Sequence, residues 1–191
     1  MHVNMALVLK FLPSYLLAPT TLPDVPRRRD AADDDFLFHQ GPARGLAKVR
    51  FADWRTSYDA FAHVPNVAVF REQAEGLVDL VTNSGPHAEQ AKDLDLLLTV
   101  GELFTLVVYG QLILEQASLT GLDSDLVDQV FDVLVRDFSA YAVDLHGKAS
   151  STKAQQLWAL EHVRKPAAGT GRYDRVWQQV RDLAGTYEMR P

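Results

Sequence analysis

The sequence contains no cysteine. Disulfide bonds, a cysteine nucleophile and a cysteine-ligated zinc site are therefore excluded, and a reducing cytoplasm is the favoured location. Positive charge is also scarce, since 19 Lys and Arg stand against 25 Asp and Glu and give a formal net charge of −6. The chain thus lacks the basic composition typical of proteins that bind nucleic acid or anionic membranes.

Recognisable catalytic motifs are missing as well. There is no Gly-x-Ser-x-Gly elbow of a serine hydrolase. The segment GPARGLAK (41–48) has neither the glycine spacing of a phosphate loop nor a Ser or Thr after its lysine. The histidines show no i, i+4 pair and no Glu-x-x-His spacing, so we predict no metal site. They are His2, His39, His63, His87, His146 and His162.

The N-terminal apolar run, residues 1–19, is too short for a membrane span and carries Lys10 in its middle. It also lacks the basic start of a secretory signal. A helical pattern is already running at Met1 without a capping residue ahead of it. Either a helix starts at the terminus, or the chain begins inside the fold of a larger protein.

Helical periodicity dominates the rest, and no segment alternates as a strand does. We predict an all-α bundle of about six helices, with a long irregular segment after the first. We expect three regions along the chain. Residues 1–18 form an N-terminal helix, which is the end of a larger bundle if the chain is truncated. Residues 19–51 form a linker or surface loop, and residues 52–191 form a helical domain. The Arg27–Arg29 run in the loop could clamp a phosphate, but a solvated loop neutralised by the aspartates at 33–35 is the simpler interpretation.

Several local signals set helix ends and faces. Pro13 should kink the first helix or end its first half, and Pro166 should stop the helix that follows a Thr152/Gln155 capping box. Before that helix, residues 124–147 carry an apolar stripe opposite a polar one. The apolar stripe is Val127, Phe131, Leu134, Phe138, Tyr141 and Leu145; the polar one is Asp125, Gln129, Asp132 and Arg136. A last apolar stripe comprises Tyr173, Val176, Trp177, Val180 and Ala184.

The segment GELFTLVVYGQLILEQA (101–117) is apolar on every face of a helix, which is typical of the buried centre of a bundle. A membrane span is the rival, but Asp95, Glu102 and Glu115 would be costly in hydrocarbon. The two glutamates are thirteen residues apart, or about 20 Å along a helix, too far to act as an acid and base pair. We expect them near the helix rim, facing solvent or a basic partner. Gln111 also interrupts the segment.

Three segments resemble the C-terminal region of bacterial acyl-CoA dehydrogenases. They are LFTLVVYGQLILEQASLTGLD (103–123), DQVFDVLVRDFSAYAVDLHGK (128–148) and YEMRP (187–191). VPRRRDAADDDFLFHQGPARGLAKVRF (25–51) is similar to the segment that precedes them in that family.

The resemblance implies a helical module of an FAD-dependent enzyme that oxidises fatty acyl-CoA. The family also has an N-terminal helical domain and a flavin-contacting β-domain, and it uses a glutamate as catalytic base. The flavin-contact motif and the sequence around that base have no counterpart here, so catalytic and cofactor-binding residues stay unassigned, and Glu102 and Glu115 take no family role. We expect no activity and no FAD binding from the chain alone.

Two hypotheses therefore stand. The first is a C-terminal helical module of an acyl-CoA dehydrogenase-like flavoprotein, whose partners are the missing domains or a second copy, with acyl-CoA as the ligand implied by the resemblance. It predicts an exposed apolar surface around the N-terminal helix. The second is a free-standing all-α protein that binds a small apolar ligand or a partner helix, and it predicts a complete core.

Overall fold

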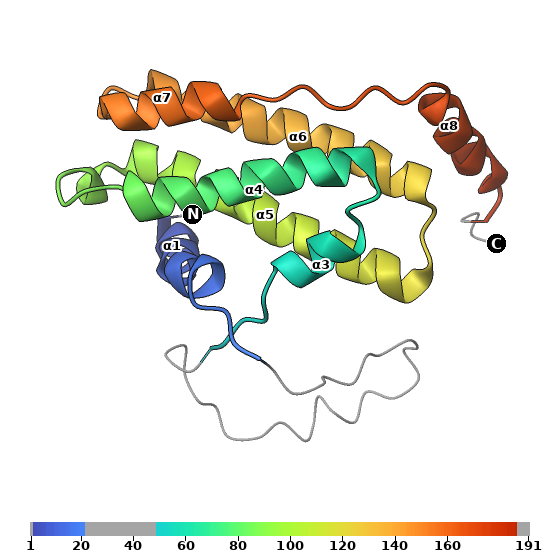
Figure 1. Cartoon of the computed structure of the whole chain (residues 1–191), viewed down its shortest axis with the longest axis horizontal. Helices are drawn as coiled ribbons and strands as arrows, with labels where there is room; N and C mark the ends of the chain where they lie inside the picture. Colours follow the sequence, from blue (N-terminus) through green and yellow to red (C-terminus); the bar gives the residue numbers. More distant parts are fainter. Residues whose placement is uncertain (1, 22–48, 187–191) are drawn as a thin grey trace.

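The computed structural model describes residues 2–21 and 49–186 of the chain. In this part of the chain there are seven α-helices and no strand (Figure 1), which confirms the all-α prediction. The helices are α1 (His2–Leu16), α3 (Arg55–Ala60), α4 (Pro65–Asn83), α5 (Leu94–Thr120), α6 (Ser124–Gly147), α7 (Lys153–His162) and α8 (Arg172–Asp182), with a 3-10 helix η2 (Gln90–Lys92) before α5.

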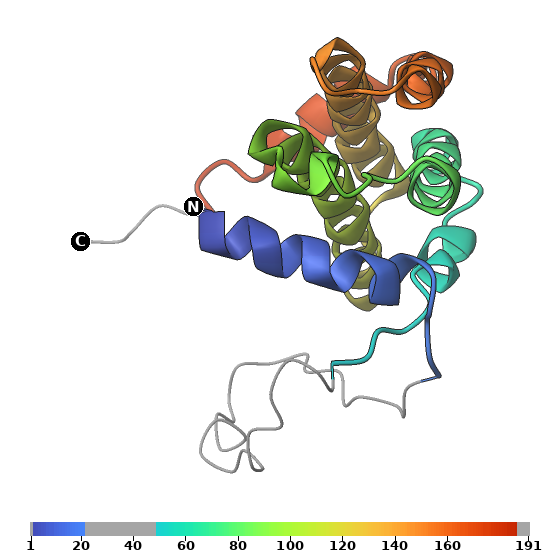
Figure 2. The same cartoon turned by 90° about the vertical axis from the view of Figure 1, so that its left-hand side faces the viewer.

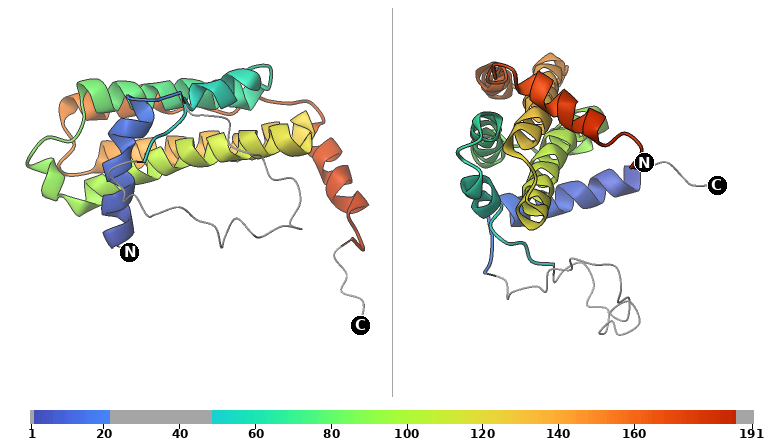
Figure 3. Two further views of the ribbon diagram at one scale, coloured as in Figure 1. Left: turned by 90° about the horizontal axis from the view of Figure 1, so that it is seen from below. Right: turned by 90° about the vertical axis from the view of Figure 1, so that its right-hand side faces the viewer.

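Helices α4, α5, α6 and α7 lie side by side along the long axis of the molecule, and α6 packs against the other three (Figures 1 and 3). Connections of a few residues join α5 to α6 and α6 to α7, so these neighbours are antiparallel. Helix α1 runs across the bundle instead of along it (Figure 2) and packs on α5. Its buried residues Leu12, Tyr15 and Leu16 belong to the same core as those of the bundle.

Local capping explains where the long helices begin and end. The Asp93 carboxylate accepts hydrogen bonds from the N–H groups of Asp95 and Leu96 at the start of α5. Gly121 ends that helix with φ 66°, a conformation that favours glycine. Thr152 and Gln155 form the predicted capping box at the start of α7.

Helix α5 contacts several elements, but they do not enclose it. It packs against α1, α3, α4, α6 and η2, and Leu103, Val107 and Leu114 are fully buried. Tyr109 and Leu112, however, are 56% and 55% exposed. By length and composition α5 could cross a membrane, but half of its most apolar stretch is buried inside the bundle, and the core helix of a soluble protein passes the same test.

Two local expectations need correction, and one of two alternatives is excluded. Helix α1 continues through Pro13 to Leu16, so of the two effects expected of the proline, an end of the first half of the helix does not occur. Helix α7 ends at His162, before Pro166. Asp132, expected on the polar outer face of α6, is only 5% exposed, because Arg172 of α8 covers it.

An extended segment, residues 163–171, connects α7 to α8 and is held along the bundle by buried side chains. The Ser139 hydroxyl bonds both the N–H and the C=O of Arg164 at 2.9 Å. The Asn66 side chain accepts from the Ala167 N–H at 2.7 Å. These hydrogen bonds pair backbone groups that have no partners within a helix. The segment leads along the bundle to α8, which lies at the end opposite α7 (Figure 1).

Candidate functional site

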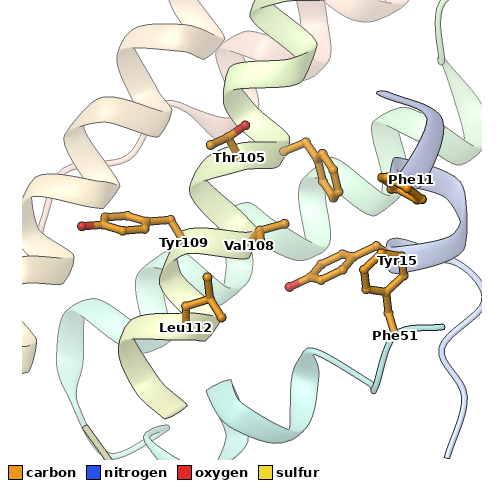
Figure 4. Close-up of a pocket in the computed structure, with 8 residues that line it drawn as sticks. Phe11, Tyr15, Phe51, Thr105, Val108, Tyr109 and Leu112 are labelled. Carbon is orange, nitrogen blue, oxygen red and sulfur yellow. The ribbon is translucent and has the colours of Figure 1, made fainter. Parts of the chain in front are cut away.

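An apolar cavity of about 290 Å³ lies where α1 crosses α5. We call it the aromatic pocket, and Figure 4 shows its lining. The size is close to the lower end of the range of about 300–1,000 Å³ for ligand pockets. The lining residues are Phe11, Tyr15, Phe51, Phe104, Thr105, Val108, Tyr109 and Leu112.

Edge-to-face aromatic contacts hold one wall of the pocket. The Phe51 ring lies 5.7 Å from Phe11 and 5.4 Å from Tyr15, measured between centroids, and Tyr15 lies 5.3 Å from Phe104. Such geometry adds to the gain from burial, because the positive ring edge meets the negative ring face. The Phe51 carbonyl also accepts a hydrogen bond from the Thr20 N–H at 2.9 Å. This bond joins the segment that begins at residue 49 to the residues that follow α1.

The opposite face of α5 is equally fixed. Tyr58 of α3 is fully buried, and its hydroxyl donates to the Val107 carbonyl at 2.7 Å. Gly110 permits this approach, since a Cβ there would lie 2.3 Å from the Tyr58 hydroxyl oxygen. The position of α5 between Tyr58 and the pocket is therefore set by a close contact that tolerates no side chain at Gly110.

A chain of polar groups borders the pocket at Tyr15. The Tyr15 hydroxyl donates to the Gln111 side-chain carbonyl, the Gln111 amide donates to Glu115 at 2.7 Å, and Ser57 donates to the same carboxylate oxygen at 3.3 Å. Burial raises the pKa of Tyr15 well above its usual value, with a smaller contribution from the Glu115 charge. Tyr15 therefore stays a neutral donor whose hydroxyl is already engaged.

The pocket can bind an apolar group, but its lining side chains are not suited to catalysis. Seven of its eight lining side chains are hydrocarbon or aromatic, and Thr105 donates its hydroxyl to the Gly101 carbonyl of its own helix at 2.8 Å. No cationic or anionic side chain lines it among the described residues. An uncharged apolar group fits such walls, whereas a phosphate or carboxylate would find no partner there.

The structure separates the two glutamates of the central helix. Glu115 is exposed and bound to Gln111 and Ser57. Glu102 is half-buried beside Tyr141, and its charge adds to the effect of burial in raising the pKa of that tyrosine. They share no site, as their spacing indicated, but neither contacts a basic side chain in the described part of the chain.

The other candidates of the sequence bring no reactive group to the pocket. Within residues 2–21 and 49–186, no three His, Asp or Glu side chains gather as a metal site. His162 stacks on Trp158 with centroids 4.5 Å apart and fills the space beside Gly76, a packing role. Arg27–Arg29, segment 41–48 and the terminal segment 187–191 lie outside the described residues.

A second, smaller cavity of about 190 Å³ lies where α4 and α6 begin and α8 packs. Arg172 is buried there and bonds Asp128 and Asp132, while Arg175 bonds Asp125 at the rim. Because each guanidinium already faces a carboxylate, neither arginine is available to an anionic ligand in this cavity. Its charges fasten α8 to α6.

Comparison with known protein families, with curated proteins and with solved structures finds no match for this chain. Fold and site together define its class, an all-α bundle with an apolar pocket beside a transverse helix. Sequence reasoning missed the pocket, although Phe11 and Tyr15 stand at i, i+4 on one face of α1 and could have indicated an aromatic wall.

Proposed function

We propose that this chain is the C-terminal helical module of an acyl-CoA dehydrogenase-like flavoprotein, and that it serves fatty acyl-CoA oxidation by packing and by shaping an apolar site. The observation that carries the proposal is the aromatic pocket. A module of this kind must leave an apolar surface beside its N-terminal helix, and the pocket opens there between α1 and α5.

The distribution of the resemblance supports the proposal. The segment 103–123 spans most of α5 and its glycine cap, and 128–148 spans most of α6. These two helices pack directly against each other, and the first of them supplies Phe104, Tyr109 and Leu112 to the pocket. The residues of these two segments thus form one structural unit, with the pocket on its surface.

The residues of the aromatic pocket do not fit FAD. The cofactor carries a pyrophosphate and a polyhydroxyl chain, which need cations and hydrogen-bond donors. Among the described residues no cation lines the pocket, and the hydroxyls of Tyr15 and Thr105 are already engaged. An acyl chain, or an apolar side chain from another domain, fits them. We therefore assign flavin binding and the catalytic base to the other domains of such an enzyme, and to this chain only the apolar contact.

A free-standing binding protein is the second candidate function. The favouring observation is the core: the fully buried aromatic residues Tyr58, Phe70, Phe131 and Phe138 pack on one another inside the bundle. A bundle with its own aromatic core could hold a small apolar ligand, or a partner helix, in the same pocket without further domains.

Two leucines of nearly equal exposure provide a test, with a matched control, of whether the pocket binds an apolar ligand. Leu112 lines it and is 55% exposed, whereas Leu160 on α7 is 57% exposed and lies elsewhere. We expect Leu112→Glu to abolish the fluorescence gain of an uncharged apolar dye such as Nile red, and Leu160→Glu to leave it intact. Equal responses of the two variants would contradict a specific role of the pocket.

A second measurement separates the two functions. The full chain is expressed alone and together with the N-terminal and β-domains of an acyl-CoA dehydrogenase. The module proposal predicts a stable complex that carries a flavin absorption band and that Leu112→Glu weakens. A monodisperse chain that binds the dye and never joins those domains would overturn the module and support the free-standing protein.

A further inference from the structure

Helix α8 carries an apolar face that the described residues leave uncovered. Tyr173, Trp177 and Val180 are 67%, 49% and 50% exposed. Val176 and Arg172 are the residues of α8 that are buried, on the side that meets α6. The helix lies at the end of the bundle opposite α7 (Figures 1 and 3), where it packs against α6.

The exposed apolar positions follow the spacing of a coiled-coil seam. Tyr173, Trp177 and Val180 are separated by four and three residues, which is the alternation of d and a positions in a heptad, and Ala184 follows four residues later in the turn after the helix. We call the three helical residues the α8 stripe. A helix that presents such a stripe is built to pack against a second helix of the same kind.

The charges beside the stripe select the partner and its direction. On the same heptad frame, Asp174 and Arg181 occupy successive e positions on one side of the stripe, both exposed and without an ion pair among the described residues. In an antiparallel pair of identical helices, e positions face e positions, so Asp174 of one copy meets Arg181 of the other, twice. A parallel pair would instead place Arg181 against the apolar Val176 of the partner, and Asp174 against Gly169, which precedes the helix.

We propose that the α8 stripe is a homodimer interface, in which a second copy of this chain packs antiparallel across it. The apolar stripe supplies the contact and the two Asp174–Arg181 pairs set its direction. The surface is self-complementary, as a two-fold interface requires. It lies away from the aromatic pocket, so the two proposals stand independently.

Charge exchange tests the direction of the contact. Asp174→Arg and Arg181→Asp each convert two attractions into two repulsions, and we expect each variant to dimerise about tenfold more weakly than the wild type. The double variant restores both pairs and should recover the wild-type affinity. Mixing the two single variants should give a heterodimer stronger than either homodimer. Sedimentation equilibrium of the full chain, at low salt and over a range of concentrations, measures the dissociation constant of the wild type, of each variant and of the mixture.

A variant of the stripe provides the remaining control. Trp177→Glu removes apolar area from an exposed position, so it should eliminate the dimer and leave the helical circular dichroism unchanged. The proposal is overturned if the wild type stays monomeric at every concentration reached. It is also overturned if the wild type dimerises but neither the charge exchange nor Trp177→Glu alters the affinity.

Discussion

The cluster that fastens α8 to α6 allows one prediction to be worked out from the structure. Arg172 bonds Asp128 and also Asp132, the second at 2.7 Å, and all three side chains are less than a tenth exposed. Replacing Arg172 by Met keeps the length of the side chain and removes the charge. Two buried carboxylates then lose their shared cation, which in general destabilises a fold by about 3–5 kcal/mol.

The partners that remain place the expected loss at the lower end of that range. Asp128 still accepts the Asn66 N–H at 2.7 Å, and Asp132 still has Arg136 at 2.5 Å. We expect a loss of about 3 kcal/mol for Arg172→Met. In a chain of this length that corresponds to a melting temperature lower by about 10 °C. Urea unfolding followed by circular dichroism gives the free energy directly.

Arg175 supplies a matched control, because it pairs with Asp125 at 2.5 and 2.7 Å but is 54% exposed. Arg175→Met should cost far less than Arg172→Met, because solvent screens this exposed pair. Adding Asp128→Asn and Asp132→Asn to Arg172→Met should recover most of the loss, since the uncompensated charges are gone. Equal costs for the two arginines, or no recovery in the triple variant, would refute the reasoning.

Three further predictions concern single positions. Gly110→Ala should lower the free energy of unfolding by about 1–3 kcal/mol, because its Cβ would meet the Tyr58 hydroxyl; an unchanged urea midpoint would contradict the close contact. Thr152→Ala should cost about 1 kcal/mol by removing the N-cap of α7, whereas Thr152→Ser should cost little. The Thr99 hydroxyl, and then Lys148, hold the pKa of Asp144 below its usual range. That stabilisation is present above the unfolded pKa of about 3.9 and is lost as the pH falls through the lower folded value, so Asp144→Asn should flatten the loss of stability on acidification below about pH 4.

Local signals predicted the helices because their causes are local. The capping box of α7 joins residues three apart, and the stripe on α6 depends only on helical period, so both could be derived from the sequence. Asp132 was misplaced because its partner, Arg172, lies forty residues away, and no local period shows which polar residue a distant guanidinium will cover.

The aromatic pocket escaped prediction for a similar reason. It exists because α1 crosses α5, and the Tyr15–Gln111 bond joins residues 96 positions apart. The sequence indicated that α5 is apolar on every side, from which we expected a fully enclosed helix. It could not indicate that one of those sides is left open by the direction of α1.

The apolar residues of α5 therefore serve two purposes, and two neighbouring leucines can separate them. Leu114 is fully buried in the core, whereas Leu112, two residues away, lines the pocket and is 55% exposed. Leu114→Ala should lower the free energy of unfolding by about 2–5 kcal/mol, because it leaves a cavity in the core. Leu112→Ala should change stability by less than about 0.5 kcal/mol. The effects on Nile red binding should be the opposite when both variants are folded: Leu112→Ala should weaken dye binding, and Leu114→Ala should not. If Leu112→Ala destabilises the fold as much as Leu114→Ala does, then this side of α5 is core, and the aromatic pocket is not a binding surface.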